Sequence, residues 1–173
     1  PSMSRYLDGG YEIVTFSMKT DKICGRRLKN KLLELFKKKD LEDVSALISD
    51  TFNRNYNPEF YIAIWDRWRS GFLVVENEKE VIGCLAAVIS APKEARIILM
   101  AIKPEHRNRG IGTLLLSEFI SRCFISDIRS VNLEVRVSND KAMRFYNSQG
   151  FDIISLLHSY YEDGEAGYLM RKV

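Results

Sequence analysis

Hydrophobic and polar residues follow two different periods along this chain, and each period predicts a different kind of element. Between residues 41 and 52 the apolar side chains recur at the three- and four-residue spacing of one helix face, at Leu41, Val44, Leu47, Ile48 and Phe52. Asp40 precedes this run in the place of an N-cap. Short apolar runs that end in polar turns predict strands instead.

The full pattern alternates strands with helices. Strands are predicted over residues 31–36, 72–76, 81–90, 95–103, 131–137, 151–157 and 167–172. Helices are predicted over residues 40–52, 59–69, 111–124 and 141–149, the last beginning at the cap residues Ser138, Asn139 and Asp140 and ending at Gly150. The order predicts one three-layer α/β domain with helices on both sides of a sheet.

Residues 1–30 show no sustained period, so we interpret them as an N-terminal extension of a domain that spans residues 31–173. Pro1 and Ser2 ahead of Met3 are interpreted as an expression remnant.

Composition and charge narrow the class of protein. The 26 basic and 23 acidic residues leave a net charge of only +3 without strong clustering, so we expect no nucleic-acid partner. No apolar run approaches the roughly 20 residues of a membrane span, which predicts a cytoplasmic protein without a membrane partner. Cys24, Cys84 and Cys123 lack metal-binding spacing, so we expect free thiols, with Cys84 and Cys123 in the core, and no metal.

Residues 98–119 carry the first sign of chemistry, because an apolar strand passes through a turn at Pro104 and reopens as a helix after Gly110 and Gly112. The first amides of a helix have no partner within it and suit an anion such as a phosphate. The glycine spacing matches neither a P-loop nor a dinucleotide motif. From this turn alone, a ligand site and a simple tight turn both remain open.

Three blocks resemble the GCN5-related N-acetyltransferases (GNAT). The segment RNRGIG at residues 107–112 resembles the [RQ]-x-x-G-x-[GA] motif, and LEVRVSNDKAMRFYNSQGF at residues 133–151 resembles a second block of this superfamily. YYEDGEAGYLM at residues 160–170 is similar to the ending of protein N-terminal acetyltransferases, with Gly167 in place of the usual alanine. The resemblance covers roughly residues 31–173. It implies the GNAT fold, whose mixed, mostly antiparallel sheet has about seven strands.

The resemblance implies acetyl-CoA as the donor, with CoA as a product. It places the pantetheine arm beside Met100, Ala101 and Ile102, and the diphosphate on the amides of Arg107, Asn108, Arg109, Gly110, Ile111, Gly112 and Thr113. The arginine side chains either add charge to this site or are ordinary surface residues.

The same resemblance implies the catalytic residues. Asn139 would contact the cofactor arm, and Tyr146, seven residues later on one helix face, would protonate the leaving thiolate. Glu134 matches the general base proposed for bacterial ribosomal-protein alanine acetyltransferases. The alternatives are a simple helix cap for Asn139, a core ring for Tyr146 and an exposed strand residue for Glu134, with an ordered water as the base.

The substrate side is expected from two aromatic segments. Tyr160 and Tyr161 resemble tyrosines that bind the backbone of the substrate peptide, and Phe52 and Tyr56 would shape the pocket for its first side chain. Arg54 replaces a glutamate of the subunit that handles small or acidic N-termini. The alternative for these rings is an aromatic core cluster.

The predicted function is acetyl transfer from acetyl-CoA to the α-amino group of protein N-termini, by direct attack of the amine. Ribosomal proteins are among the candidate substrates, and a monomer or weak homodimer is expected. Acetylation of lysine or of a small amine such as a polyamine remains an alternative. A catalytically silent acyl-CoA-binding regulatory protein is a further one.

Overall fold

The computed structural model describes residues 31–78 and 80–173 with their side chains, and the backbone of residues 5–7, 11–13 and 26–28. The predicted extension over residues 1–30 lies largely outside the described residues, and so does its boundary with the domain. Both stay predictions.

The chain forms ten strands and four α-helices within the described residues. The strands are β1 (Arg5–Leu7), β2 (Tyr11–Ile13), β3 (Arg26–Leu28), β4 (Lys31–Leu35), β5 (Phe72–Glu76), β6 (Val81–Ala91), β7 (Glu94–Ile102), β8 (Ser130–Arg136), β9 (Asp152–Leu157) and β10 (Gly167–Lys172). The α-helices are α1 (Leu41–Phe52), α2 (Pro58–Arg67), α3 (Ile111–Ile125) and α4 (Asp140–Ser148), and the 3-10 helices are η1 (Lys38–Asp40), η2 (Arg69–Gly71) and η3 (Pro104–His106). None of the helices in the described part of the chain is long and apolar enough to cross a membrane.

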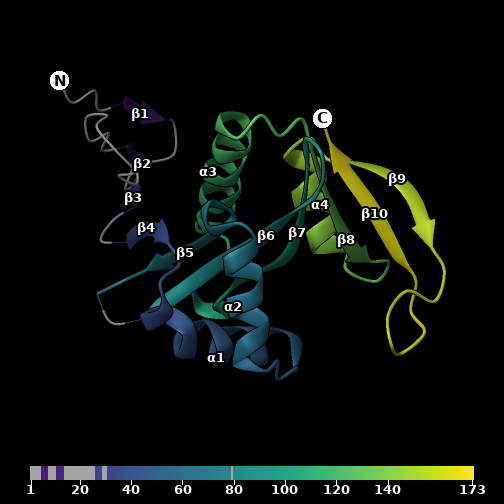
Figure 1. Cartoon of the computed structure of the whole chain (residues 1–173), viewed down its shortest axis with the longest axis horizontal. Helices are drawn as coiled ribbons and strands as arrows, with labels where there is room; N and C mark the ends of the chain where they lie inside the picture. Colours follow the sequence, from purple (N-terminus) through teal and green to yellow (C-terminus); the bar gives the residue numbers. More distant parts are fainter. Residues whose placement is uncertain (1–4, 8–10, 14–25, 29–30, 79) are drawn as a thin grey trace.

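The strands form one sheet in the order β1-β2-β3-β4-β5-β6-β7-β8-β10-β9. Neighbouring strands are antiparallel except β7 and β8, which are parallel and are joined through α3. Strands β4 to β10 are the seven predicted ones, so the mixed and mostly antiparallel sheet is confirmed. Three-residue strands β1 to β3 continue the sheet beyond β4 (Figure 1).

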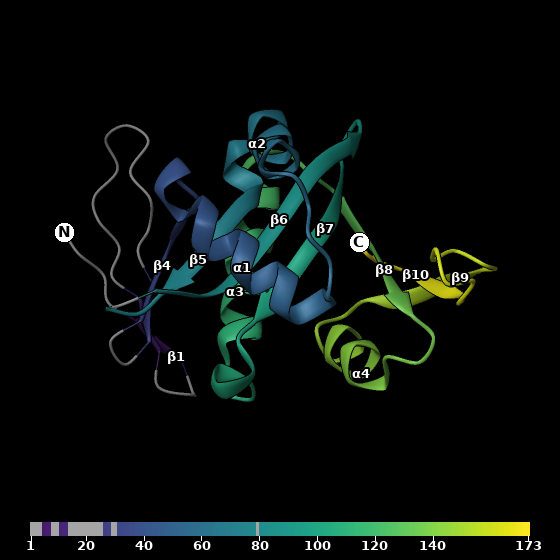
Figure 2. The ribbon, with the colours of Figure 1, turned by 90° about the horizontal axis from the view of Figure 1, so that it is seen from below.

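Helices cover both faces of the sheet, as the three-layer prediction requires (Figures 1 and 2). Residues of β6 alternate between the two cores, because successive side chains of a strand point to opposite faces. Cys84 and Ala86 lie in the core under α1 and α2, whereas Leu85 and Ala87 lie in the core under α3. The two layers of apolar side chains fix the sheet between the helices.

Cys84 and Cys123 are buried free thiols, which confirms that they belong to the core. Burial raises the pKa of each thiol to about 12. Because the thiolate is the reactive form, neither side chain is a nucleophile at neutral pH.

Helix boundaries follow local chemistry. Helix α4 begins where the side-chain oxygen of Asn139 accepts a hydrogen bond from the amide of Ala142, 3.1 Å away, and Gly150 adopts a φ of +85° just after its end. Both signals were predicted. Helix α2 ends at Arg67, two residues before the predicted end. The ring of Trp68 covers Gly71 so closely that an added Cβ there would lie 2.4 Å from it, and the chain turns through η2 instead.

Candidate active site

The loop between β7 and α3 has the backbone of an anion site. Asn108 and Gly110 adopt φ values of +56° and +79°, so the chain reverses sharply before α3 begins at Ile111. No side chain forms a capping hydrogen bond at this helix start. The first-turn amides and the positive end of the helix dipole are therefore directed at one place, where an anion is stabilised.

Three basic side chains lie near this loop, those of Arg107, Arg109 and Lys31. Arg107 folds back, and its Nε donates to the carbonyl oxygen of Ile102 at 2.9 Å. Arg109 is exposed. Burial, and then the charge of Arg109, lower the pKa of the nearby Lys31 ammonium. Two neighbouring cations thus add to the field of the helix end, and the residues present fit an anionic diphosphate.

Gly112 allows close packing at the start of α3. A Cβ built on this residue would lie 3.2–3.4 Å from side-chain atoms of Phe145, Ile102 and Met100. The missing side chain lets the start of α3 approach both β7 and α4. Gly112 therefore brings the loop, the strand edge and the α4 helix together.

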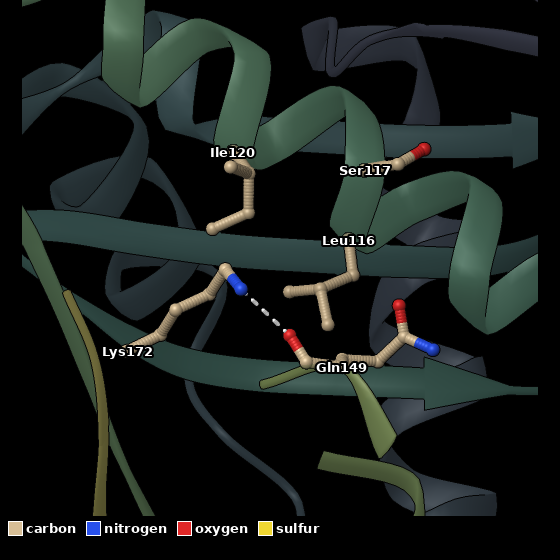
Figure 3. Close-up of a pocket in the computed structure, with 5 residues that line it drawn as sticks. All are labelled: Leu116, Ser117, Ile120, Gln149 and Lys172. Atoms are coloured by element: carbon tan, nitrogen blue, oxygen red, sulfur yellow. Dashed lines mark hydrogen bonds between the residues drawn. The ribbon is translucent and has the colours of Figure 1, made fainter. Parts of the chain in front are cut away.

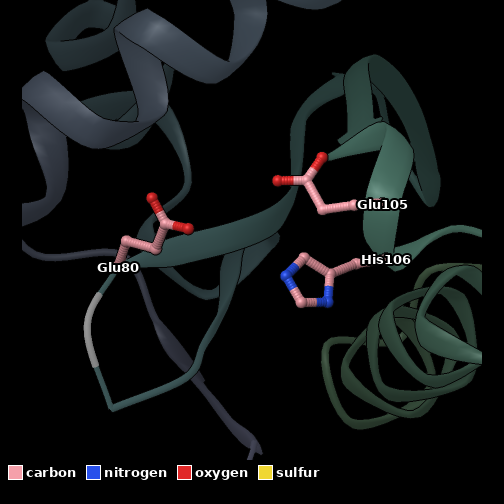
Figure 4. A group of neighbouring side chains, drawn as sticks. All are labelled: Glu80, Glu105 and His106. Atoms are coloured by element: carbon pink, nitrogen blue, oxygen red, sulfur yellow. The ribbon is translucent and has the colours of Figure 1, made fainter.

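Three ionisable side chains lie beside the same loop. One carboxylate oxygen each of Glu80 and Glu105 and one ring nitrogen of His106 all lie within 4.8 Å of one another (Figure 4). Lys103 donates to Glu80, and this hydrogen bond raises the pKa of the Lys103 ammonium. Because the ammonium already supplies a positive charge, we interpret the cluster as an ion-pair network that ties the turn after β5 to η3. The expectation that the protein needs no metal stays a prediction.

A gap opens between β7 and β8. The two strands pair only where residues 94–96 face residues 130–132, and the described residues show no further pairing although β7 continues to Ile102 and β8 to Arg136. Beyond this junction β8, β9 and β10 turn away from β6 and β7 (Figure 2). Met100, Ala101 and Ile102 lie on the part of β7 that borders the gap.

Tyr146 reaches this part of β7 from α4. Its hydroxyl donates to the sulfur of Met100 at 3.4 Å, and burial raises the pKa of the hydroxyl. The ring packs edge-on against Phe151, with centroids 5.6 Å apart. A thioether is a weak acceptor, so the hydroxyl can exchange this partner for a better one. The side chain is thus both part of the packing and a donor at the gap.

Asn139 lies at the start of the helix that carries Tyr146. Its oxygen serves as the α4 cap, which is one of the two roles that the sequence left open. A contact with the cofactor arm would use the amide nitrogen or the second lone pair of this oxygen, and it stays a prediction.

Glu134 is held by an arginine that the sequence analysis did not single out. Its Oε2 accepts from the Nε of Arg96 at 3.0 Å, and the Nη2 of the same guanidinium donates to the Tyr160 hydroxyl at 2.7 Å. Alternation along β7 gave the one available signal, because Arg96 stands between the buried Ala95 and Ile97 on the opposite face. The sequence could not name its partners, 38 and 64 residues away.

The loop between β9 and β10 is fixed to β8 by a second arginine. Arg136 donates to Asp163 at 2.8 Å and to Glu165 at 2.6 Å, and its guanidinium lies 4.0 Å from the ring centroid of Tyr161. Hydrogen bonds from Ser138 and then from Arg136 lower the pKa of Glu165 to about 2. This loop therefore has a defined position beside the gap.

The predicted substrate residues after α1 face the same loop. Nη2 of Arg54 lies 3.2 Å from the Glu162 carboxylate, so two segments distant in sequence meet across the site. Phe52 is exposed, whereas the ring of Tyr56 stacks on Phe60 with centroids 4.5 Å apart. Tyr56 thus packs in an aromatic cluster, and Phe52 and Arg54 lie at the surface.

A shallow pocket of about 230 Å³ lies elsewhere, between α3 and the end of β10 (Figure 3). Its lining residues are Leu116, Ser117, Ile120, Gln149 and Lys172. None of them is a predicted site residue, so the candidate site lies at the edge of β7 where its pairing with β8 has ended and not in this hollow.

Comparisons with known proteins agree on the family. The model of the Acetyltransferase (GNAT) family matches residues 41–151. An uncharacterized N-acetyltransferase of Methanocaldococcus jannaschii is 35% identical over 142 residues, which cover 82% of this chain and 90% of that protein. An N-alpha-acetyltransferase of Sulfurisphaera tokodaii is 29% identical over 143 residues, 76% of this chain and 86% of that protein.

A solved structure gives the same result. The crystal structure of Ard1 from Thermoplasma volcanium is similar with a TM-score of 0.79 and 31% identity, and the match covers 83% of this chain and 97% of that one. The fold, the loop before α3 and these relatives point the same way, and the chain belongs to the Acetyltransferase (GNAT) family.

Proposed function

We propose that this protein transfers the acetyl group of acetyl-CoA to the α-amino group of protein N-termini. The observation that carries the proposal is that two tyrosine hydroxyls lie at the β7–β8 gap. That of Tyr146 contacts Met100 of β7, and that of Tyr160 contacts Arg96, which also binds Glu134. The relatives named N-alpha-acetyltransferase support the same substrate class.

Residues of the α3 loop would hold the donor. The amides from Arg107 to Thr113 suit its diphosphate, and the unpaired edge of β7 at Met100–Ile102 suits the amides of its pantetheine arm. Bound acetyl-CoA supplies a thioester that an amine can attack directly. The chain's own contribution is to orient the two reactants and to stabilise the leaving sulfur.

Tyr146 is the proposed acid. Because its pKa is raised, the hydroxyl keeps its proton at neutral pH and remains a hydrogen-bond donor. The hydroxyl donates to the sulfur of Met100. The thioester sulfur of acetyl-CoA could accept the same hydrogen bond instead. An ordinary thiol, with a pKa of about 8.5, is a stronger acid than this hydroxyl, so Tyr146 would stabilise the leaving thiolate chiefly through its hydrogen bond.

The engagement of Glu134 with Arg96 favours an α-amine over a lysine. An α-amino group with a pKa near 7.8 is neutral roughly one-seventh of the time at pH 7, whereas a lysine side chain is neutral only about four times in ten thousand. A lysine substrate therefore needs a strong base, while an α-amine gains less than about tenfold from one. A carboxylate that already accepts from a guanidinium suits the less demanding amine.

Replacing Glu134 by glutamine should lower kcat/KM on a peptide with a free N-terminus by less than about tenfold. Glutamine keeps the shape and can still accept from Arg96, so the change isolates proton acceptance. Steady-state assays of Glu134→Gln and of Glu94→Gln, at the far end of β7, provide the comparison. A loss above a hundredfold in the first variant alone would make Glu134 the principal base.

Two matched peptides test the proposed function. Both peptides share one sequence with an internal lysine. The first begins with a free alanine, as a ribosomal-protein substrate could, and the second has a blocked N-terminus. With acetyl-CoA, mass spectrometry should locate the acetyl group on the first peptide's α-amine and find the second peptide unmodified. Acetyl-lysine on both peptides would support the lysine alternative. CoA binding without product across varied N-termini and spermidine would support a silent protein.

A further inference from the structure

Arg96 stands at the vertex of the β7–β8 gap. It is the last β7 residue that pairs with β8, opposite Asn132. Its side chain extends past this pair to Glu134, two residues further along β8, and to Tyr160 in the loop after β9. One guanidinium therefore joins β7, β8 and the β9–β10 loop at the place where the backbone pairing ends.

The two hydrogen bonds use different donors of the guanidinium. Nε and Nη2 lie 3.0 Å from Glu134, and Nη2 also donates to the oxygen of Tyr160 at 2.7 Å. The planar fork of arginine can serve both partners at once, whereas the ammonium of lysine is a point charge on a flexible stem. The Arg96 side chain is 40% exposed, so a bound peptide can lie against this contact.

The contact fixes the polarity of the Tyr160 hydroxyl. A hydroxyl carries one hydrogen and two acceptor lone pairs. Since the oxygen of Tyr160 accepts from a charged donor, its own hydrogen must be directed away from Arg96. Tyr160 is thereby prepared to donate to an acceptor in the gap, and the carbonyl oxygens of a peptide backbone are acceptors of that kind.

Neighbouring charges hold other parts of the same loop. Arg54 pairs with Glu162, and Arg136 pairs with Asp163 and Glu165. Within the described residues, Arg54 and Arg136 hydrogen-bond carboxylates of this loop, whereas Arg96 hydrogen-bonds the Tyr160 hydroxyl, so the orientation of that hydroxyl depends on Arg96.

We propose that Arg96 is a positioning residue that orients Tyr160 as a hydrogen-bond donor to a backbone carbonyl of the substrate peptide, while it holds the β9–β10 loop against β7 and β8. This inference rests on the proposed function for its substrate. Its structural half, the position of the loop, holds or fails without any substrate.

Kinetics test the substrate half. Arg96→Met keeps the apolar stem of the side chain and removes the guanidinium with its hydrogen bonds. It should raise the KM for a free N-terminal peptide about tenfold, with kcat within about threefold and the KM for acetyl-CoA unchanged. Tyr160→Phe leaves the Arg96–Glu134 pair intact and should show the same split. The double variant should be no worse than Arg96→Met alone, because both changes remove the same hydrogen bond from Tyr160 to the peptide.

Arg96→Lys and Arg129→Met are the controls. Lysine should restore less than half of the lost peptide affinity, since it cannot reproduce the fork. Arg129 also binds a carboxylate, that of Asp127, but lies at the other end of α3, so its replacement should change no kinetic constant. Additive losses in the Arg96→Met, Tyr160→Phe double variant, or an equal fall in kcat, would overturn the orientation of Tyr160.

Hydrogen exchange tests the structural half. The amides of Tyr161 and Gly164 donate within the loop at 3.1 Å and 2.8 Å, so their exchange reports its order. Arg96→Met should speed their exchange at least tenfold, while Arg129→Met should not. Unchanged exchange would overturn the role of Arg96 in holding the loop, whether or not the protein is active. If the wild-type protein acetylates no N-terminal peptide, the proposed function is refuted, and the exchange experiment still decides the structural half.

Discussion

Replacing Tyr146 by phenylalanine should lower kcat about a hundredfold and leave the affinity for CoA within about twofold. The variant keeps the ring that packs against Phe151 and loses the hydroxyl that reaches Met100 at the gap. A donor to the leaving sulfur matters in the transition state far more than in the bound state, so the loss should appear in turnover. Single-turnover kinetics and calorimetry measure the two quantities separately.

Tyr168→Phe is the matched control for this prediction, because Tyr168 also packs partly buried against the same core but belongs to β10. It should retain nearly full turnover. The pH profile adds an independent check, since the raised pKa of Tyr146 means that kcat should show no fall between pH 7 and about 10. Equal losses of turnover and CoA affinity in Tyr146→Phe would make the residue a binding group only.

Replacing Arg109 by glutamate should weaken CoA binding about tenfold to a hundredfold. The substitution puts a negative charge where Lys31 and Arg109 now approach each other beside the first turn of α3. Repulsion of a diphosphate from that place is electrostatic, so the difference from wild type should shrink at high ionic strength. Calorimetric titration with CoA at low and high salt measures both effects.

Arg67→Glu changes the net charge by the same amount at the end of α2, away from the loop. It should leave CoA affinity within about twofold. If both substitutions weaken binding equally, the effect belongs to the overall charge of the protein, and the assignment of the loop to the diphosphate is wrong.

Local patterns predicted most of the fold because their causes are local. The cap at Asn139 and the left-handed conformation of Gly150 depend on residues a few positions away in the chain, so the sequence predicted both. The end of α2 was misplaced because it depends on how Trp68 lies over Gly71, a contact that no periodicity encodes. Propensity alone is a weak guide where tertiary packing decides.

The candidate site divides in the same way. The loop around Gly110 follows from a strand, a turn and a helix that are consecutive in sequence. Arg96 does not, because its partners Glu134 and Tyr160 are brought to it only by the pairing of distant strands. Alternation could place Arg96 on the face opposite Ala95 and Ile97, but it could not show that this face is also that of Glu134.

The short junction between β7 and β8 also has a thermodynamic consequence. Three residue pairs join β7 to β8 in the described part of the chain, whereas β6 with β7 and β8 with β10 form long antiparallel ladders. A ligand that bridges the gap binds only the folded arrangement, so it stabilises the protein by an amount that grows with the logarithm of its concentration. Acetyl-CoA bound at the proposed site would therefore raise the free energy of unfolding of this protein in addition to serving as its substrate.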